Sequence, residues 1–165
     1  MEAPKQTPAV AQAANQSGNA IATAGGSRAR FLDVLGSTFD IVLGDYGKAY
    51  SRQNVHGNSF VIPVGGRQLN NAIRVLGNRE GLTLRKADIA EINEHLQATA
   101  ETAGQRVRVW YRVAEIDGGV EIDVGDEFHR VVRLAGGKAA VVRSGATSCF
   151  VRPGTMLPLA IPADT

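Results

Sequence analysis

Alternating residues in the last third of the chain carry the side chains best suited to binding chemistry. Arg106, Arg108, Trp110 and Arg112 are each separated by one apolar or aromatic residue. Side chains of a β-strand alternate between its two faces, so these four are expected on one face. Guanidinium groups contact phosphates and an indole stacks on a base, and a single-strand binding platform combines these two contacts. The spacing therefore predicts a nucleic-acid-binding strand at 106–112.

Three other basic residues extend this predicted interface: Arg67, Arg74 and Lys86. Arg67 follows the Gly65-Gly66 pair at the start of an expected helix, where free backbone N–H groups and the helix dipole favour an anion. A Gly-Gly pair before a helix is more often a simple turn, so this signal is weaker than the arginine strand. We expect all three residues to lie near that strand.

Carboxylates are also concentrated in this part of the chain and provide the competing interpretation. They are Glu115, Asp117, Glu121, Asp123, Asp126 and Glu127. Glu121 and Asp123 alternate with apolar residues, so we expect them on an exposed sheet face, paired with Arg112 or Arg130, rather than in a two-metal site. If these carboxylates neutralise the arginines, or if the helices cover the arginine face, no platform forms.

The remaining reactive residue types do not assemble into a recognisable catalytic set. His56, His95 and His129 are expected in a loop, a helix and a strand, without metal-ligand spacing. Cys149 beside Phe150 is expected to be a small core residue, because no nearby residue would lower its pKa. The sequence has no G-x-x-x-x-G-K-[ST] phosphate loop. We therefore expect a protein that is not an enzyme and has no cofactor or metal.

Composition and charge place these residues in a soluble globular protein. The chain has 165 residues, 44% of them hydrophobic and 21% charged, with one cysteine. It has no apolar run near the roughly 18 residues of a membrane span and no secretory signal pattern, which predicts a cytoplasmic protein that does not enter membranes. The net charge of +2 comes from residues 1–30, and the rest holds 15 basic and 15 acidic residues. Binding to nucleic acid must then depend on a local patch.

The first half of the chain divides into an arm and a small α+β unit. Residues 1–30 are rich in small and polar residues, which predicts a disordered arm. Residues 31–104 are expected to form strands at 39–43, 48–52 and 58–64, with Pro63 at a sheet edge, and two helices. The first helix covers 67–76 and is expected to stop at Gly77, and the second runs from Lys86 to a stop at Gly104.

The second half changes to the period of a β-sheet. Residues 105–152 predict a four-stranded antiparallel meander with strands at 106–113, 120–124, 128–134 and 138–143. The expected hairpin loops are Gly118-Gly119, which sets Val113 opposite Val124, and Gly136-Gly137. Residues 153–165 are predicted to form an extended tail that contains prolines. The fold class is therefore α+β, with a three-stranded sheet and two helices followed by the meander.

Two stretches of the chain resemble a known kind of protein. Residues 112–134 have a D-G turn, a strand, an aspartate and a D-E-aromatic sequence, and 150–159 read F-V-R-P-G-T-M-L-P-L. This pair is similar to the domain upstream of the P-loop ATPase in prophage and mobile-element helicase-primase-like proteins. Residues 47–50, 60–63 and the helix from Arg67 are similar to the opening strands and helix of that family. Phe128 stands where the family usually has tryptophan, and the Arg67 helix has fewer arginines.

The resemblance implies a replication context and no particular chemistry, because the ATPase module itself is absent from this sequence. We therefore expect a non-catalytic nucleic-acid-binding accessory domain of a phage or mobile-element replication system, with single-stranded DNA as a partner. The alternative is a protein-interaction or oligomerisation module that docks a replicative ATPase or helicase. The arginine and tryptophan strand favours the first function, and the neutral charge of residues 31–165 favours the second. Self-association is compatible with both.

Overall fold

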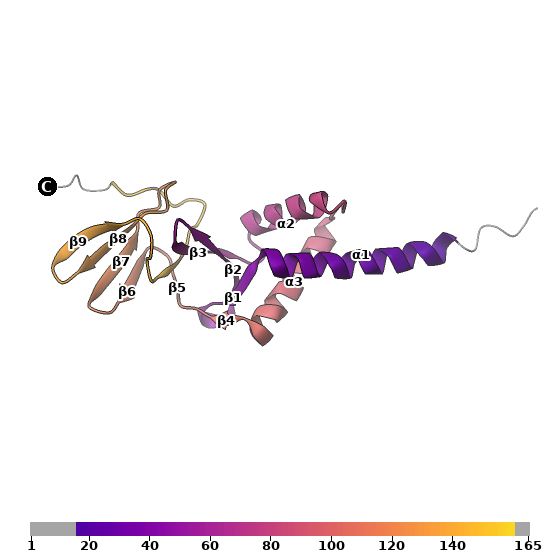
Figure 1. Ribbon diagram of the computed structural model, residues 1–165, viewed down its shortest axis with the longest axis horizontal. Helices are drawn as coiled ribbons and strands as arrows, with labels where there is room; N and C mark the ends of the chain where they lie inside the picture. The colour runs from indigo at the N-terminus through magenta and orange to yellow at the C-terminus, as the bar shows by residue number, and fades with distance from the viewer. Residues whose placement is uncertain (1–15, 161–165) are drawn as a thin grey trace, which may run out of the picture.

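The computed structural model describes the backbone of residues 16–160 and the side chains of residues 26–160, and it has an α+β fold (Figure 1). Strands β1 (Asp40–Leu43), β2 (Ala49–Val55) and β3 (Asn58–Pro63) form an antiparallel meander. Helices α2 (Arg67–Arg79) and α3 (Lys86–Ala103) follow. The predicted order of three strands and two helices is confirmed. The helix stop at Gly77 is wrong, because α2 continues to Arg79, while Gly104 does end α3.

Helix α1 (Gln16–Thr38) precedes the first strand. The predicted disordered arm therefore differs from the structure over residues 16–30, and residues 1–15 lie outside the described part of the chain. Phe31 and Leu35 of α1 are buried in one core with Leu69 and Ile73 of α2 and apolar residues of α3. Adding residues to an existing helix is favourable compared with nucleating one. We infer that these two anchors support the helical turns before them.

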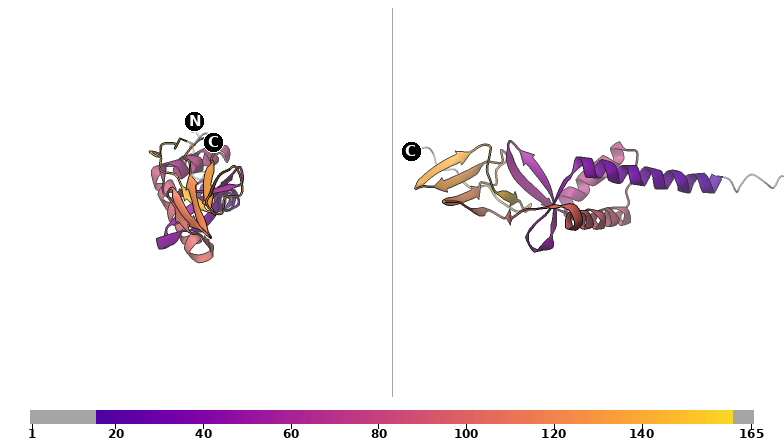
Figure 2. Two further views of the ribbon diagram at one scale, coloured as in Figure 1. Left: turned by 90° about the vertical axis from the view of Figure 1, so that its left-hand side faces the viewer. Right: turned by 60° about the horizontal axis from the view of Figure 1, so that its bottom comes forward.

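The first sheet has six strands in the order β4-β1-β2-β3-β10-β5, and it curls (Figure 2). The short end strands β4 (Gln105–Arg106) and β5 (Val109–Trp110) are consecutive in the chain. β4 pairs in parallel with β1, and β5 pairs in parallel with β10. One extended segment thus provides both end strands of the curled sheet, whose apolar interior includes Val42, Tyr50 and Val61. The expected first strand of the meander, 106–113, is therefore wrong.

Strand β10 (Cys149–Val151) lies inside this six-stranded sheet, between β3 and β5 and parallel to both. The predicted boundary that placed it in a meander over 105–152 is wrong. All three of its residues are buried, as expected of a strand covered on both faces. β3 is consequently an interior strand, and Pro63 ends it without lying at a sheet edge.

The second sheet is an antiparallel meander of β6 (Val113–Ile116), β7 (Gly119–Asp123), β8 (Val131–Ala135) and β9 (Lys138–Val142). The predicted Gly136-Gly137 loop is confirmed by the pairing of Ala135 with Lys138. The other loop is Asp117-Gly118, because Ile116 pairs with Gly119, and Val113 therefore faces Ile122 instead of Val124. This shift of two positions keeps the same side chains on each face.

The three layers follow one another along the molecule, with the helices at one end and the four-stranded sheet at the other (Figure 1). The inner face of the second sheet packs on the first, where Ala114 and Val131 meet Phe60 and Phe150. Its outer face carries apolar side chains from all four strands, and Val113, Leu134 and Val141 there are exposed. Of the helices within residues 16–160, none is long and apolar enough to cross a membrane.

Candidate nucleic-acid interface

The predicted arginine strand keeps its alternation but does not form a free platform. Val107 and Val109 pack into the interior of the first sheet, so Arg108 between them projects outward. The guanidinium carbon of Arg108 lies 4.2 Å from the centroid of the Trp110 ring. Trp110 is half-buried against the core between the two sheets. Arg108 and Trp110 therefore form a stacked pair, and the Trp110 ring is only partly open to a ligand.

Arg112 contacts the tail of the chain. Its Nη2 donates a hydrogen bond of 2.7 Å to the carbonyl oxygen of Leu157 in the tail. This contact joins the residue before β6 to the tail at Leu157. Arg106 is exposed and belongs to β4, whereas Trp110 belongs to β5.

The other three predicted binding residues lie among the helices. Arg67 and Arg74 belong to α2, and Arg74 donates a 2.9 Å hydrogen bond to the carbonyl oxygen of Leu84. Lys86 is the first residue of α3, whereas Arg106 follows its last residue. At 1.5 Å per residue an 18-residue helix separates them by about 27 Å. Lys86 therefore lies far from Arg106, contrary to the expectation, and the proximity of Arg67 and Arg74 to the arginine strand stays a prediction.

The two central carboxylates are buried instead of exposed. Glu121 accepts a hydrogen bond of 3.0 Å from Arg133 Nε and one of 2.9 Å from the backbone N–H of Ser148. Asp123 accepts one of 2.8 Å from Arg152 Nε. The predicted partners Arg112 and Arg130 are wrong, because β10 and the loop before it cover this face of β7. These carboxylates join the two sheets and do not neutralise the arginine strand.

A seam pocket of about 460 Å³ opens where the chain crosses from β4 to β5. The Arg108 and Trp110 stack borders it, together with Arg52 from β2 and Cys149 from β10. Arg52 is already held by Asp40 at 2.7 Å. Glu115 and Asp117 also line the pocket, so its charges nearly balance. Burial raises the pKa of Cys149 to about 11, which keeps its thiol protonated at neutral pH.

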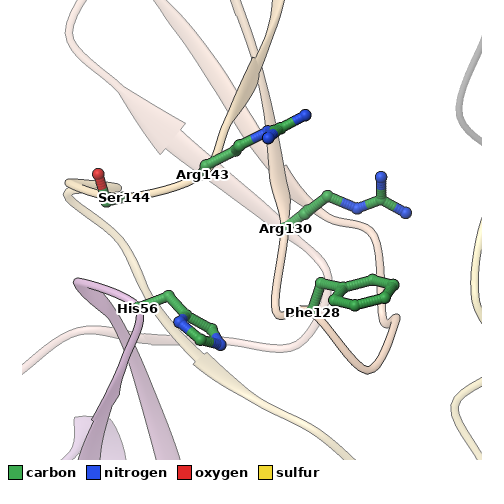
Figure 3. Close-up of a pocket in the computed structure, with 5 residues that line it drawn as sticks. All are labelled: His56, Phe128, Arg130, Arg143 and Ser144. Carbon is green, nitrogen blue, oxygen red and sulfur yellow. The ribbon is translucent and has the colours of Figure 1, made fainter.

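A second cavity, which we call the tip pocket, offers a better anion site. Its volume is about 590 Å³, and it is lined by His56, Phe128, Arg130, Arg143 and Ser144 (Figure 3). These residues come from the β2–β3 turn, the segment between β7 and β8, and the segment after β9. Figure 3 shows the guanidinium of Arg130 beside the ring of Phe128, and the two are 5.3 Å apart.

The charge of the tip pocket is positive. Its five lining residues include two arginines and a histidine and no carboxylate. Arg130 forms an ion pair with Asp126, and among the described side chains Arg143 has no hydrogen-bond or ion-pair partner. The ring of Phe128 is 57% exposed. The exposed ring can stack on a planar group, and the guanidiniums of Arg130 and Arg143, which line the same cavity, can hold an anion next to it.

No family model, curated protein or solved structure matches this chain. Its function has to be inferred from the residues themselves.

Buried hydrogen bonds hold the loops around the tip pocket. Asn58 is 1% exposed; its Nδ2 donates to the carbonyl oxygen of His129, and its Oδ1 accepts from the backbone N–H of Ala146, both at 2.9 Å. Gly57 accepts a 3.1 Å bond from the N–H of Gly145. Burial opposes ionisation of Asp126, but its bonds from Arg130 outweigh this and lower its pKa. The pocket is therefore built into the fold.

Asn58→Ala should lower the free energy of unfolding by about 1 to 3 kcal/mol, because it leaves the part-buried carbonyl of His129 and N–H of Ala146 without their partner. Urea unfolding measures this loss. The matched control is Asn54→Ala, at an exposed position of β2, with an expected change under about 0.5 kcal/mol. Equal effects of the two variants would contradict the role given to Asn58.

Sequence reasoning did not find the tip pocket. It placed Phe128 in a strand, whereas the ladder of β8 begins only at Val131. His129 has a positive φ of 55°, which bends the chain before β8. A phenylalanine directly after Asp126-Glu127 was the available signal, because an aromatic residue in a charged turn is rarely core. Within residues 16–160, no group of three histidine, cysteine or acidic side chains is arranged to hold a metal.

Proposed function

We propose that this chain binds single-stranded nucleic acid as a non-catalytic accessory domain, with the tip pocket as its central contact. The observation that carries the proposal is the exposed ring of Phe128 beside Arg130, in a cavity that Arg143 also lines and that no carboxylate lines. A base stacks on the ring and the adjoining phosphates lie against the two guanidiniums. Single strands rather than duplexes fit, because stacking on Phe128 requires an unpaired base.

The wider setting of this function comes from the resemblance to mobile-element replication proteins. It supports a role in the cytoplasm beside a replicative ATPase or helicase. Phe128 occupies the position at which that family usually has tryptophan, and both residue types offer a ring for stacking. The residues of the tip pocket supply stacking and charge, so we assign no reaction to it.

The first test compares the affinity of purified variants for a fluorescent single-stranded oligonucleotide by polarisation. Phe128→Ala should weaken binding by about 1 to 3 kcal/mol, roughly 5- to 150-fold, through lost stacking. Arg143→Ala should weaken binding to all sequences and reduce the salt slope by about 0.7, the contribution of one phosphate contact on a single strand. The control Arg79→Ala removes an equal charge from an exposed site at the end of α2 and should leave the affinity unchanged.

The same titration separates the tip pocket from the arginine strand. Trp110→Ala and Arg108→Ala should have smaller effects than Phe128→Ala, because Trp110 is half-buried and Glu115 and Asp117 line the same pocket as Arg108. If these two variants weaken binding more than Phe128→Ala does, the binding site is the arginine strand and not the tip pocket. Absence of binding at both about 50 mM and about 200 mM salt would contradict nucleic-acid binding altogether.

A second candidate function is the protein-interaction module that docks a replicative ATPase. The observation that favours it is the exposed apolar surface of the tail, where Leu157 is 78% exposed. Leu159 and Tyr111 nearby are also exposed. Large exposed apolar patches on a protein mark interaction sites. This module becomes the better account if no single strand binds.

A further inference from the structure

The four-stranded sheet ends in two strands, β6 and β9, that each have a neighbour on one side only. The outer edge of each strand carries backbone N–H and C=O groups that can pair with another strand. Val113 and Glu115 of β6 are exposed, and every residue of β9 except Val142 is exposed. The edges are therefore accessible, and their backbone groups determine how a strand could add.

The direction of each backbone group follows from the two hairpin loops. Residues that flank a two-residue loop exchange hydrogen bonds, and bonded positions then alternate along the strand. In β6, Ile116 and Ala114 point toward β7, and the alternation continues to Arg112, whose carbonyl accepts from the N–H of Asp123 at 2.8 Å. Val113 and Glu115 consequently present their backbone groups outward. By the same rule Ala139 and Val141 are the outward positions of β9.

Strand β9 lacks the features that usually protect a sheet edge. Its sequence is Lys-Ala-Ala-Val-Val, with no proline and with one charge at its first residue. Charged side chains, prolines and bulges are the common guards against edge pairing. Ala139 and Ala140 point to opposite faces of the sheet, and both are too small to obstruct a strand that adds at this edge.

Charge selects which edge would pair with which. The β6 edge ends in Glu115 and Asp117, whereas the β9 edge begins with Lys138. Antiparallel pairing of Val113 with Val141 of a second copy also sets Glu115 opposite Ala139, and it joins the outward groups of both strands. Asp117 then lies beside Lys138 of the second copy. Pairing β9 with another β9 would bring Lys138 toward Arg143 without any carboxylate, and pairing β6 with β6 would gather four acidic residues.

We propose that copies of this chain associate head to tail, with β9 of one copy added to β6 of the next. The contact extends the four-stranded sheet and continues its outer apolar face from copy to copy. It is heterologous, so each added copy leaves one free β6 and one free β9, and the assembly grows into a chain or a ring.

Sedimentation velocity across a range of protein concentrations tests this arrangement. The wild-type protein should form species larger than dimers as concentration rises. Val141→Lys blocks β9 and Val113→Lys blocks β6, so each variant alone should stay monomeric. Mixed in equal amounts they should form a heterodimer and nothing larger, because one copy retains β6 and the other retains β9. Leu134→Lys, on the same outer face but in the interior strand β8, is the control that should still associate.

Several outcomes would overturn the proposal. If the wild-type protein stays monomeric at every concentration, the proposal is wrong. Dimers of Val113→Lys alone would indicate pairing of β9 with itself, and dimers of Val141→Lys alone would indicate pairing of β6 with itself. Loss of association in Leu134→Lys would indicate stacking of the outer faces instead of edge pairing. Circular dichroism confirms that each variant is folded.

Discussion

Phe150→Ala is expected to lower the free energy of unfolding by about 3 to 5 kcal/mol, the usual range for a buried phenylalanine. Phe150 is 0% exposed and lies in β10, inside the first sheet. It packs against Phe60 of the same sheet, with ring centroids 6.4 Å apart, and belongs to one core cluster with Ala114 and Val131 of the second sheet. Its loss leaves a cavity at the junction of the two sheets.

Urea unfolding of Phe150→Ala can be followed by the fluorescence of Trp110, the single tryptophan, which borders the same cluster. Phe128→Ala is the matched control, because it removes an equal side chain from an exposed position. Its expected cost is under about 1 kcal/mol. A similar cost for both variants would show that β10 does not connect the sheets in the way described.

Glu121→Ala should also lower the free energy of unfolding by about 3 to 5 kcal/mol, because it breaks a buried ion pair and leaves the partner charge uncompensated. Glu121 is 0% exposed and accepts hydrogen bonds from Arg133 and from the backbone N–H groups of Thr147 and Ser148. The substitution leaves these donors without an acceptor at the point where the loop before β10 crosses β7. The matched control is Glu115→Ala, on the neighbouring strand β6, at an exposed position.

The same carboxylate gives the stability of the protein a pH dependence of known sign. Burial alone would raise the pKa of Glu121, but hydrogen bonds from Ser148, Arg133 and Thr147 outweigh it and lower the pKa below 4.5. Its contribution is therefore present above about pH 4.5 and is lost as the pH falls through the lower folded value. The difference in unfolding free energy between the wild type and Glu121→Ala should shrink below that pH. A difference that stays constant or grows would contradict this assignment.

Local patterns predicted the elements that depend on neighbours in sequence. The meander of β1, β2 and β3 and the helices α2 and α3 followed from alternation and from 3.6-residue spacing. The Gly136-Gly137 hairpin was predicted correctly because a two-residue loop fixes its own register. Helix α1 was not predicted, because residues 16–30 lack apolar spacing and no element was assigned to 31–38. Its anchors, Phe31 and Leu35, pack against helices that come later in the chain.

The misplaced elements are those whose partners are distant in the chain. Strand β10 pairs with β3 about ninety positions earlier, and β4 pairs with β1 more than sixty positions earlier. No local period distinguishes such a pairing from a hairpin with the next strand. The run 106–113 was therefore predicted as one meander strand, although it closes the first sheet and only then enters the second.

For the binding residues, the sequence by itself determined the chemistry available: arginines next to aromatic rings, no phosphate loop and a nearly neutral fold. It also determined the alternation around Val107 and Val109, because that depends only on backbone geometry. Tertiary structure alone decided which charges are free. Glu121 forms an ion pair with Arg133, and Asp123 forms one with Arg152. Residues from three segments that are separated in the chain meet at the tip pocket. Burial and ion pairing depend on segments that packing brings together from distant parts of the chain. The local sequence pattern around a residue does not specify which distant segments will contact it.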